Sequence, residues 1–313
     1  LPEVEVVRRG LAPAVTGARV VGISVEDPRA LKRHIPLGGD DGLGGHGVTM
    51  SAAAGASRAA DFERRLTGAV FGAPARRGKF LWVPLLGEGE PSQALLAHLG
   101  MSGQMLLRAH EAPDDRHVRV RLWLEHPEHG ELRLDFADQR LFGSLAIDAL
   151  DGTEDAAPGG LGTELALMPS QAAHIARDPL DPAFDDPAFV AGLRRRNTGV
   201  KRALLDQGLV SGVGNIYADE ALWRSRLHPE TPGSRLSARK ATELLAHVRE
   251  VFAQALIEGG TSFDEQYVNV NGQAGYFSHS LNAYGRTGEP CGRCGGPIKR
   301  ITFGGRGSHF CPR

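Results

Sequence analysis

The sequence predicts an α+β protein with an N-terminal β-sandwich or barrel followed by a helical region. Short strand-like segments recur at regular spacing as far as about residue 148. Residues 149–170 are rich in loop-forming residues and make the best domain boundary, and beyond them the hydrophobic pattern is helical. At 313 residues the chain is long enough for two domains, or for one domain with appendages.

The N-terminal half begins with a helix and continues mainly with strands. Residues 1–11 carry a proline in the first turn followed by acids, which is typical of a helix start. Residues 36–60 are rich in Gly and Ala without a convincing period, and we interpret them as a mobile insertion. A helix-like segment is expected at 61–66. Strands are expected at 18–26, 69–71, 76–83, 94–99, 103–107, 118–124, 132–136 and 143–147.

Four helices are expected in the second half, at 187–196, 201–207, 215–226 and 237–259. Between the second and the third, Gly212 and Gly214 flank a valine, and Asn215 is a good N-cap. The helix N-terminus and Lys201 would both be available to one anion, which favours a phosphate site. An ordinary helix hairpin with a glycine turn is an equally good interpretation.

Charge is unevenly distributed along the chain. The net charge is -1, but residues 191–313 hold 17 Lys+Arg against 10 Asp+Glu, whereas residues 1–190 hold 19 against 27. A basic C-terminal part indicates a polyanionic partner, with a solvated basic face as the alternative. No apolar run approaches the ~18 residues of a membrane span. We expect no signal peptide, no membrane association and a reducing cytoplasmic location, because three cysteines are too few for a disulfide framework.

The cysteines have zinc-ribbon spacing. Cys291 and Cys294 enclose two residues, and Cys311 follows after sixteen more. A structural zinc site needs four ligands. We expect the fourth to be a cysteine after Arg313, with His309 as a less suitable donor and unrelated free thiols as the alternative.

Several segments, in order, resemble one family. They are Leu1-Pro-Glu-Val-Glu5, Arg77-Gly-Lys79, His98-Leu-Gly-Met-Ser-Gly103, Asp138-Gln-Arg-Leu-Phe-Gly143, Gly212-Val-Gly-Asn-Ile-Tyr-Ala-Asp-Glu220, and Tyr284-Gly-Arg-Thr-Gly-Glu-Pro-Cys291 with Gly305-Arg-Gly-Ser-His-Phe-Cys311. Together they resemble the formamidopyrimidine-DNA glycosylases, which are bacterial base-excision repair enzymes. The resemblance covers most of the chain outside residues 36–60.

The resemblance implies a domain order. A β-sandwich with flanking helices would span 1–150 with its insertion at 36–60, and a linker would span 151–182. A helix-two-turn-helix domain at 183–260 and a lesion-recognition loop at 261–283 would follow. A zinc β-hairpin at 284–313 would hold one structural Zn²⁺.

The resemblance also implies site residues. Lys79 would contact DNA and donate a proton in β-elimination, a role that suits an ammonium. Arg306 would grip phosphates around the flipped nucleotide and take part in δ-elimination. The metal ligands would be Cys291, Cys294 and Cys311.

Three more residues would fill the gap left by an extruded nucleotide, since a base cannot be attacked inside the stack. These are Met101, Arg140 and Phe142, of which Arg140 would read the cytosine opposite the lesion. Leu141 stands where an arginine is often found, so one phosphate contact is expected to be absent. The phosphate-contacting residues would be His117, Lys201 and Asn215, and the resemblance also makes His98 and Tyr284 candidates for DNA binding. The loop at 269–275 favours 8-oxoguanine and formamidopyrimidines as substrates.

The start of the chain departs from the family pattern. Family members begin Pro-Glu-Leu-Pro-Glu-Val-Glu, with the first proline as nucleophile and the next glutamate as general acid/base. This sequence begins at the third residue of that pattern, and Pro2 cannot substitute because its nitrogen lies in an amide. We expect both catalytic residues to precede Leu1, as in a clipped sequence more than in a natural pseudo-enzyme.

The expected function is a bifunctional DNA glycosylase and AP lyase, acting as a monomer on duplex DNA with oxidised bases in the cytoplasm, at the nucleoid. It would excise oxidised purines through a Schiff base and then nick the strand by β,δ-elimination. Two alternatives are a non-catalytic damaged-DNA binding protein and an endonuclease VIII-like glycosylase for oxidised pyrimidines.

Overall fold

The computed structural model describes residues 1–39, 50–113, 115–260, 269–273 and 275–313, which fall into two compact units. The sheet unit consists of the described residues of Glu3–Ala173 and Ser262–Gly275. The helical unit consists of those of Leu1–Pro2, His174–Thr261 and Tyr276–Arg313. Among the described helices, none is long and apolar enough to cross a membrane.

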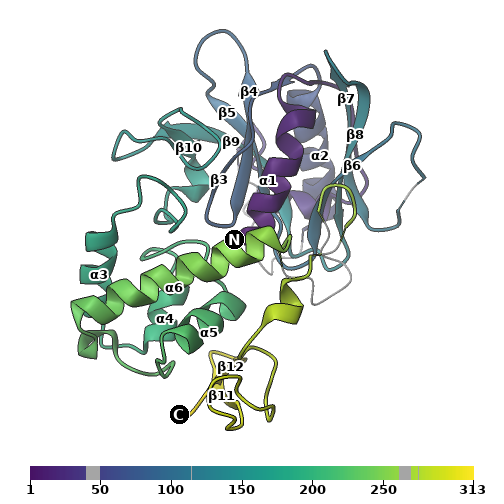
Figure 1. Ribbon diagram of the computed structural model, residues 1–313. Helices are drawn as coiled ribbons and strands as arrows, with labels where there is room; N and C mark the ends of the chain where they lie inside the picture. Colours follow the sequence, from purple (N-terminus) through teal and green to yellow (C-terminus); the bar gives the residue numbers. More distant parts are fainter. Residues whose placement is uncertain (40–49, 114, 261–268, 274) are drawn as a thin grey trace. The chain divides into compact units, whose positions relative to one another are not determined.

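The sheet unit contains a ten-stranded sheet in which neighbouring strands are antiparallel (Figure 1). The strand order is β10-β9-β5-β4-β2-β1-β7-β8-β6, with β3 paired to β4. The strands are β1 Arg19–Val25, β2 Val70–Phe71, β3 Ala75–Arg77, β4 Phe80–Leu86, β5 Gln93–His98, β6 Gly103–Arg108, β7 Val118–His126, β8 Gly130–Asp138, β9 Ser144–Gly152 and β10 Leu167–Pro169.

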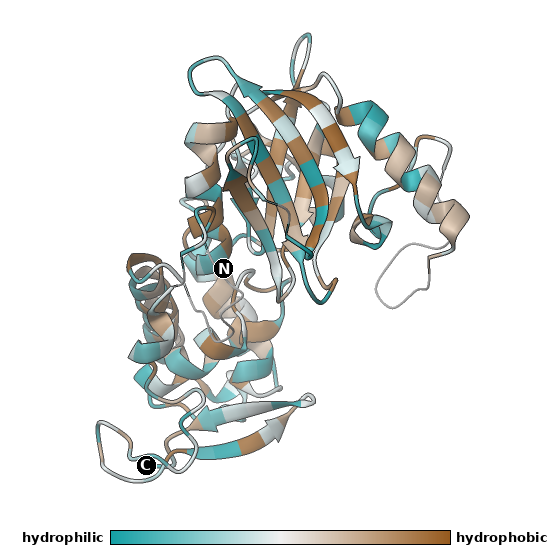
Figure 2. Ribbon diagram, turned by 90° about the vertical axis from the view of Figure 1, so that its right-hand side faces the viewer, coloured by the Kyte–Doolittle hydropathy of each residue, from teal (hydrophilic) through white to brown (hydrophobic). Residues whose placement is uncertain are grey.

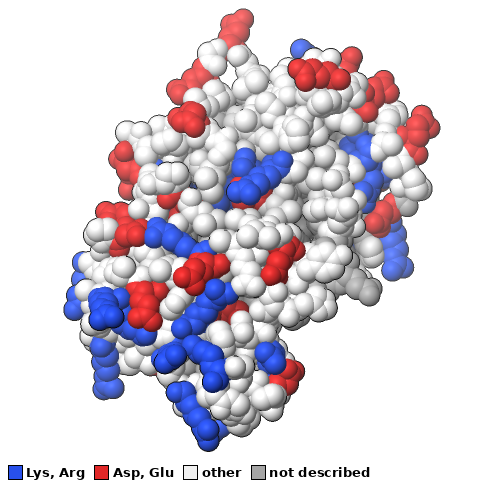
Figure 3. Space-filling model, in the orientation of Figure 1, with Lys and Arg blue, Asp and Glu red and all other residues white. Residues whose placement is uncertain are grey.

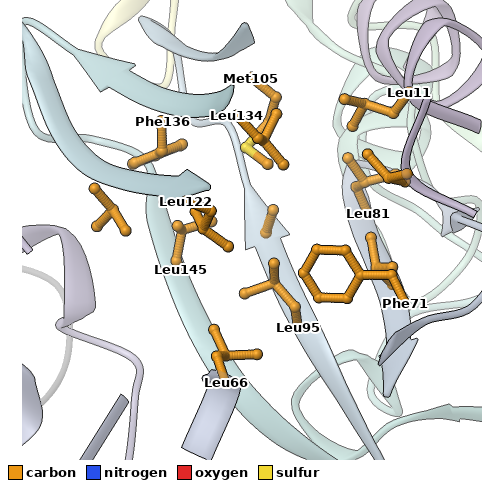
Figure 4. Close-up of a cluster of buried hydrophobic side chains, with 14 of the residues drawn as sticks. Leu11, Leu66, Phe71, Leu81, Leu95, Met105, Leu122, Leu134, Phe136 and Leu145 are labelled. Carbon is orange, nitrogen blue, oxygen red and sulfur yellow. The ribbon is translucent and has the colours of Figure 1, made fainter. Parts of the chain in front are cut away.

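This sheet folds over a large apolar core, which confirms the predicted sandwich. Leu81 and Leu95 come from β4 and β5, and Leu122 and Leu134 come from β7 and β8, yet all four belong to one buried cluster (Figure 4). Burial alternates along β7, and the alternating colours of the strands in Figure 2 follow the same two-residue period. Two helices, α1 Pro2–Val15 and α2 Ala52–Leu66, add apolar side chains to this core.

The helix α2 corrects the interpretation of residues 36–60. Residues 52–60 are helical, with Ser51 as N-cap, whereas residues 40–49 lie outside the described part of the chain. The prediction failed because the first turns of α2 are mostly Ala and Gly, and its large core residues, Phe62 and Leu66, come only at the end. The expected strand at 76–83 is also wrong in one respect, since it is two strands that turn at Gly78.

The helical unit is built around α3 Asp186–Arg194, α4 Val200–Leu205, α5 Asn215–Arg224 and α6 Ala238–Ile257. All four predicted helices are confirmed, and they share a second core with Leu1. A two-stranded hairpin, β11 Lys299–Phe303 and β12 Arg306–Phe310, completes the unit. Gly214, and not Asn215, is the N-cap of α5, so the predicted cap is one residue too late.

Candidate nucleic-acid interface and metal centre

Two loops of the sheet unit carry the residues expected to enter the duplex. Met101 lies between β5 and β6, and Arg140 and Phe142 lie between β8 and β9. Met101 is 55% exposed and Phe142 is 39% exposed, so two large apolar side chains lie exposed at the tips of these loops. The Arg140 guanidinium lies 4.8 Å from the centre of the Phe142 ring. An exposed apolar pair with one adjacent cation is the arrangement that a base-displacing wedge requires.

The backbones of the two loops touch. Gly100 has φ +62°, and a Cβ there would lie 2.6 Å from the carbonyl carbon of Phe142, so only glycine permits this approach. Leu141 also has a positive φ, of 54°. For a residue with a Cβ, that conformation costs roughly 1–2 kcal/mol and needs support from its surroundings.

The carboxylate of Asp138 holds both loops. Its Oδ1 accepts hydrogen bonds from the Ser102 hydroxyl at 2.5 Å and the Arg140 N–H at 3.1 Å, and its Oδ2 accepts the Gly143 N–H at 2.7 Å. Arg119 donates to the Asp138 carbonyl at 2.8 Å. Four bonds on one buried residue fix the ends of the loop and leave its side chains exposed.

The other candidates of the sheet unit lie at turns and strand ends. Lys79 is half-buried in the turn between β3 and β4. His98 ends β5, where its Nδ1 accepts the Gly100 N–H at 3.2 Å. The carbonyl of His117 accepts the Asp138 N–H at 2.9 Å. His98 and His117 therefore contact the segments that carry Met101 and Arg140.

The predicted lesion loop falls partly on residues 261–268 and 274, outside the described residues. Within the described part, Asn269 closes a turn by accepting the Asn271 and Gln273 N–H groups on its Oδ1, both at 3.0 Å. Val270 is buried, and its carbonyl accepts the Leu107 N–H at 2.9 Å. This turn is thereby attached to β6.

In the helical unit, the two predicted anion-binding residues converge on one oxygen atom. Lys201 Nζ lies 3.5 Å and Asn215 Nδ2 lies 3.1 Å from the carbonyl oxygen of Gly307 in the hairpin. Lys201 is 0% exposed and forms a 2.6 Å ion pair with Asp219 of α5. Burial lowers the pKa of Lys201, and the carboxylate of Asp219 opposes this effect.

Asp219 joins α5 to the hairpin. Besides Lys201, its carboxylate accepts the Ser308 hydroxyl at 3.0 Å and the His309 N–H at 2.8 Å. The exposed Arg306 begins the strand that carries both residues. On the face shown in Figure 3, many of the Lys and Arg side chains gather over the helices and hairpin of this unit.

Tyr284 is placed by a second carboxylate on α5. Glu220 accepts the N–H groups of Ala283 and Tyr284 on one oxygen, at 2.8 and 2.9 Å. The Tyr284 ring packs edge-on against His309, with ring centres 4.9 Å apart. Tyr284 therefore lies beside the hairpin strand that begins at Arg306.

The three cysteines come together as a metal centre. The sulfur atoms of Cys291, Cys294 and Cys311 all lie within 4.8 Å of one another, and this is the metal-binding cluster found among the described residues. Burial would raise the pKa of Cys291, but N–H groups from Arg293 and Trp223 outweigh it and lower the pKa to about 6. A thiolate at this position fits Zn²⁺. His309, the alternative ligand, is directed at Asp219 instead, with Nδ1 3.3 Å from its carboxylate.

Trp223, from the last turn of α5, braces the centre. Its indole N–H donates to Cys291 Sγ at 3.4 Å, and the Arg293 guanidinium stacks on its ring at 3.8 Å. Arg293 also donates to the Trp223 carbonyl. Outer hydrogen bonds of this kind orient metal ligands and tune their basicity.

Sequence reasoning missed the residues that hold the site together, namely Asp138, Asp219, Glu220 and Trp223. The available signal was position, since the three acids lie inside motifs and Trp223 lies three residues after one. Many of their partners are distant in sequence; Ser308 and Asp219, for example, are 89 residues apart. Hydrogen bonds over such separations have no local pattern.

Comparisons with known proteins agree with this geometry. Residues 1–145 match a family model described as Formamidopyrimidine-DNA glycosylase N-terminal domain, and residues 175–266 match the H2TH domain of the same family. Residues 288–313 match "Zinc finger found in FPG and IleRS". With the clustered thiols, this last match identifies a structural zinc site. When bound, zinc would be held by these thiolates and would supply a cross-link between the ends of the zinc-finger segment.

Relatives extend the similarity over the whole chain. The formamidopyrimidine-DNA glycosylase of Leifsonia xyli subsp. xyli is 58% identical over 313 residues, covering 100% of this chain and 98% of the relative. That of Thermobifida fusca is 51% identical, covering 100% and 96%.

Solved structures agree as well. The Lactococcus lactis Fpg bound to DNA with an abasic site has a TM-score of 0.74 at 29% identity, covering 100% of this chain and 97% of the other. The MutM (Fpg) protein of Thermus thermophilus has a TM-score of 0.73 at 33% identity, with the same coverage. The resemblance seen in the motifs is therefore confirmed, and the chain belongs to the formamidopyrimidine-DNA glycosylase family.

Proposed function

We propose that the protein is a DNA glycosylase of base-excision repair that removes 8-oxoguanine and formamidopyrimidines from duplex DNA and then nicks the strand as an AP lyase. The observation that carries this proposal is the cluster of Met101, Arg140 and Phe142 at the exposed tips of two braced loops. An enzyme that extrudes a base must fill the space left behind, and an apolar wedge offsets the lost stacking. Arg140 supplies donors for the remaining base.

Structures of similar proteins support the substrate class. The Lactococcus lactis Fpg was solved with DNA containing an abasic site and with DNA containing Fapy-dG, and a MutM was solved with DNA containing carbocyclic 8-oxo-G. We propose the same lesions for this protein, acting as a monomer on nucleoid DNA in the cytoplasm.

The first chemical step is proposed to use a proline amine preceding Leu1. Its lone pair attacks C1′ of the sugar, the bond to the base breaks, and the base leaves with a proton supplied by the neighbouring glutamate. Lys79 is proposed to donate the proton in β-elimination, and Arg306 to act in δ-elimination. These roles follow the family motif that the two residues match.

The remaining candidates are proposed to hold the DNA and the metal. His98, His117 and Tyr284 are proposed DNA contacts. Lys201 and Asn215 are proposed to act through the hairpin, because both donate to Gly307 beside Arg306. Cys291, Cys294 and Cys311 are proposed zinc ligands, with a fourth cysteine expected after Arg313.

Borohydride trapping on duplex DNA with 8-oxoguanine opposite cytosine tests the enzyme proposal. Protein that carries Pro-Glu before Leu1 should form a covalent adduct, because borohydride reduces the Schiff base. Tight binding without an adduct would favour a non-catalytic damaged-DNA binding protein. Faster excision of thymine glycol than of 8-oxoguanine would favour the oxidised-pyrimidine alternative.

A matched pair of variants tests the wedge itself. Removing both apolar tips, in Met101→Ala/Phe142→Ala, should slow 8-oxoguanine excision by on the order of tenfold or more, because unstacking is no longer offset. Val21→Ala shortens an apolar side chain that is 49% exposed on β1 and should leave the rate unchanged. Equal rates for both variants would contradict the proposed role of the loops.

A further inference from the structure

The tip of the loop between β8 and β9 includes residues whose backbone Asp138 does not hold, and Leu141 is one of them. The carboxylate of Asp138 fixes the N–H groups of Arg140 and Gly143. Leu141 lies between them with a positive φ of 54°, which L side chains rarely adopt. The direction of the loop tip therefore depends on what stabilises Leu141.

Lys32 supplies that support. Its ammonium Nζ donates a hydrogen bond to the carbonyl oxygen of Leu141 at 2.6 Å, across 109 residues of sequence. The side chain is half-buried, and burial lowers its pKa while the carboxylate of Asp138 opposes this effect. A charge-assisted hydrogen bond in a partly desolvated place is stronger than one between neutral groups.

The main chain from which Lys32 projects is itself fixed. Lys32 is the C-cap of the short helix η1 Pro28–Leu31. The N-cap of this helix, Asp27, forms ion pairs with Arg29 and Arg119. Arg58 of α2 is buried and donates to the carbonyls of Leu31 at 3.3 Å and Lys32 at 3.0 Å. The helix α2 thus braces η1.

Two residues further on, His34 gives a second attachment. It is fully buried, and its Nδ1 accepts the Ile147 N–H at 3.2 Å. Because Nδ1 is an acceptor, Nε2 carries the proton and donates to Asp61 of α2 at 3.1 Å. Lys32 therefore extends from a segment held on both sides.

We propose that Lys32 is a positioning residue that holds the Arg140–Phe142 tip in the orientation that discriminates the base opposite the lesion. It acts through the Leu141 carbonyl. This inference rests on the proposed function, because discrimination is measured as excision of 8-oxoguanine opposite cytosine and opposite adenine.

The test compares single-turnover excision from these two duplexes, using protein that carries Pro-Glu before Leu1. The wild type should excise faster opposite cytosine. Lys32→Met should lower the ratio of the two rates by about five- to tenfold, chiefly through slower excision opposite cytosine. Lys32→Arg, which keeps a cationic donor, should stay within about twofold of the wild-type ratio. Lys32→Gln keeps a shorter neutral donor and should give an intermediate ratio. This variant replaces Lys32→Met in the test if the methionine variant does not fold.

Arg19→Met is the matched control. Arg19 also donates to a backbone carbonyl, that of Gly68 at 2.8 Å, but it pairs with Glu125 at the far end of β7 from Val118. Val118 pairs with Ala137, beside the loop that begins after Asp138. Glu125 lies seven residues further along β7, which places Arg19 roughly 23 Å from that loop. Arg19→Met removes one positive charge, as Lys32→Met does, and should leave the ratio of the two excision rates unchanged.

Three outcomes would overturn the inference. An unchanged ratio in Lys32→Met would overturn it while leaving the proposed function intact. Equal losses on both duplexes, with a log–log salt slope smaller by about one, would mean that Lys32 contacts a phosphate instead. A wild-type protein that excises 8-oxoguanine from neither duplex would overturn the proposed function and this inference with it.

Discussion

Asp138 in the sheet unit and Asp219 in the helical unit are each 1% exposed, and each accepts a hydroxyl and a backbone N–H, yet Asp219 also pairs with a buried ammonium. Asp138 accepts a hydroxyl and two backbone N–H groups, so it fixes a loop whose functional side chains stay exposed. Asp219 pairs with Lys201, which the sequence predicted as an anion-binding residue, and thereby buries it. Asp138 therefore fixes the backbone that carries candidate residues of the sheet unit, whereas Asp219 pairs directly with a candidate residue of the helical unit.

This difference predicts how much stability each unit loses when its aspartate is removed. A carboxylate that binds neutral donors leaves ordinary unsatisfied groups when it is removed. A carboxylate that neutralises a buried ammonium leaves an uncompensated charge, which costs more. The helical unit should therefore be the more sensitive of the two to loss of its aspartate.

The largest effect is expected for Asp219→Asn. Lys201 would keep its charge without a counter-charge, at a cost of about 3–5 kcal/mol in the free energy of unfolding of the helical unit. Denaturant unfolding followed by tryptophan fluorescence measures this in a Trp82→Phe/Trp123→Phe background, where Trp223 of the helical unit is the remaining tryptophan. The double variant Lys201→Met/Asp219→Leu should recover much of the loss.

The control is the exposed pair of Arg196 and Asp206, whose side chains are 32% and 44% exposed. Asp206→Asn should cost under about 1 kcal/mol, because exposed pairs are screened by water. If both variants lost similar amounts of unfolding free energy, the buried pair would be no more important to stability than the surface pair.

Glu5 is a second buried carboxylate of the sheet unit, and unlike Asp138 it is paired with cations. Burial would raise the pKa of Glu5, but Arg8 and Arg76 outweigh it and lower the pKa from 4.5 to about 2. Because the folded pKa lies below the unfolded value, Glu5 stabilises the fold fully above pH 4.5. This contribution, of about 3 kcal/mol, is lost as the pH falls toward 2.

Glu5→Gln checks this in acid titrations of the unfolding free energy. The variant should lose stability near neutral pH and show a weaker pH dependence between 4.5 and 2. Glu26→Gln, on the exposed Glu26, is the control and should keep the wild-type acid profile. If the unfolding free energy of Glu5→Gln depended on pH between 4.5 and 2 as steeply as that of the wild type, other carboxylates would dominate acid unfolding.

The comparison also shows what the sequence could predict. Period-two alternation predicted the strands of the sandwich, and the glycines around residue 100 predicted that Met101 lies at a loop tip. Both signals are local. The pairing of Lys201 with Asp219 is not, because it joins α4 to α5 across the glycine turn.

Lys201 and Asn215 illustrate the limit more closely. The glycine turn predicted that Lys201 and the helix N-terminus would face one anion, and the family resemblance added the Asn215 side chain. In the structure the Lys201 and Asn215 side chains face one oxygen atom. That oxygen belongs to Gly307, 92 residues beyond Asn215, so tertiary packing decided the acceptor.

The metal centre offers a smaller test of the helical unit. Trp223→Phe keeps an aromatic ring but removes the N–H that donates to Cys291, so it should weaken zinc binding by about tenfold. Competition with a coloured chelator measures the affinity, and the Co²⁺ spectrum reports the thiolate set. Trp82→Phe, in the sheet unit, is the matched control and should not change zinc affinity. Unchanged affinity in Trp223→Phe would limit the tryptophan to packing.

The smallest effect concerns salt. Arg306 is exposed and Lys201 is not, so their removal should affect DNA binding differently. Arg306→Ala should reduce the slope of log affinity against log salt by about one, the signature of one lost phosphate contact. Lys201→Met should weaken binding through the hairpin with little change in slope, because a buried, paired ammonium releases no counterion. A full unit of slope lost in Lys201→Met would show that DNA draws Lys201 away from Asp219, and that the helical unit exposes this lysine only when it is bound.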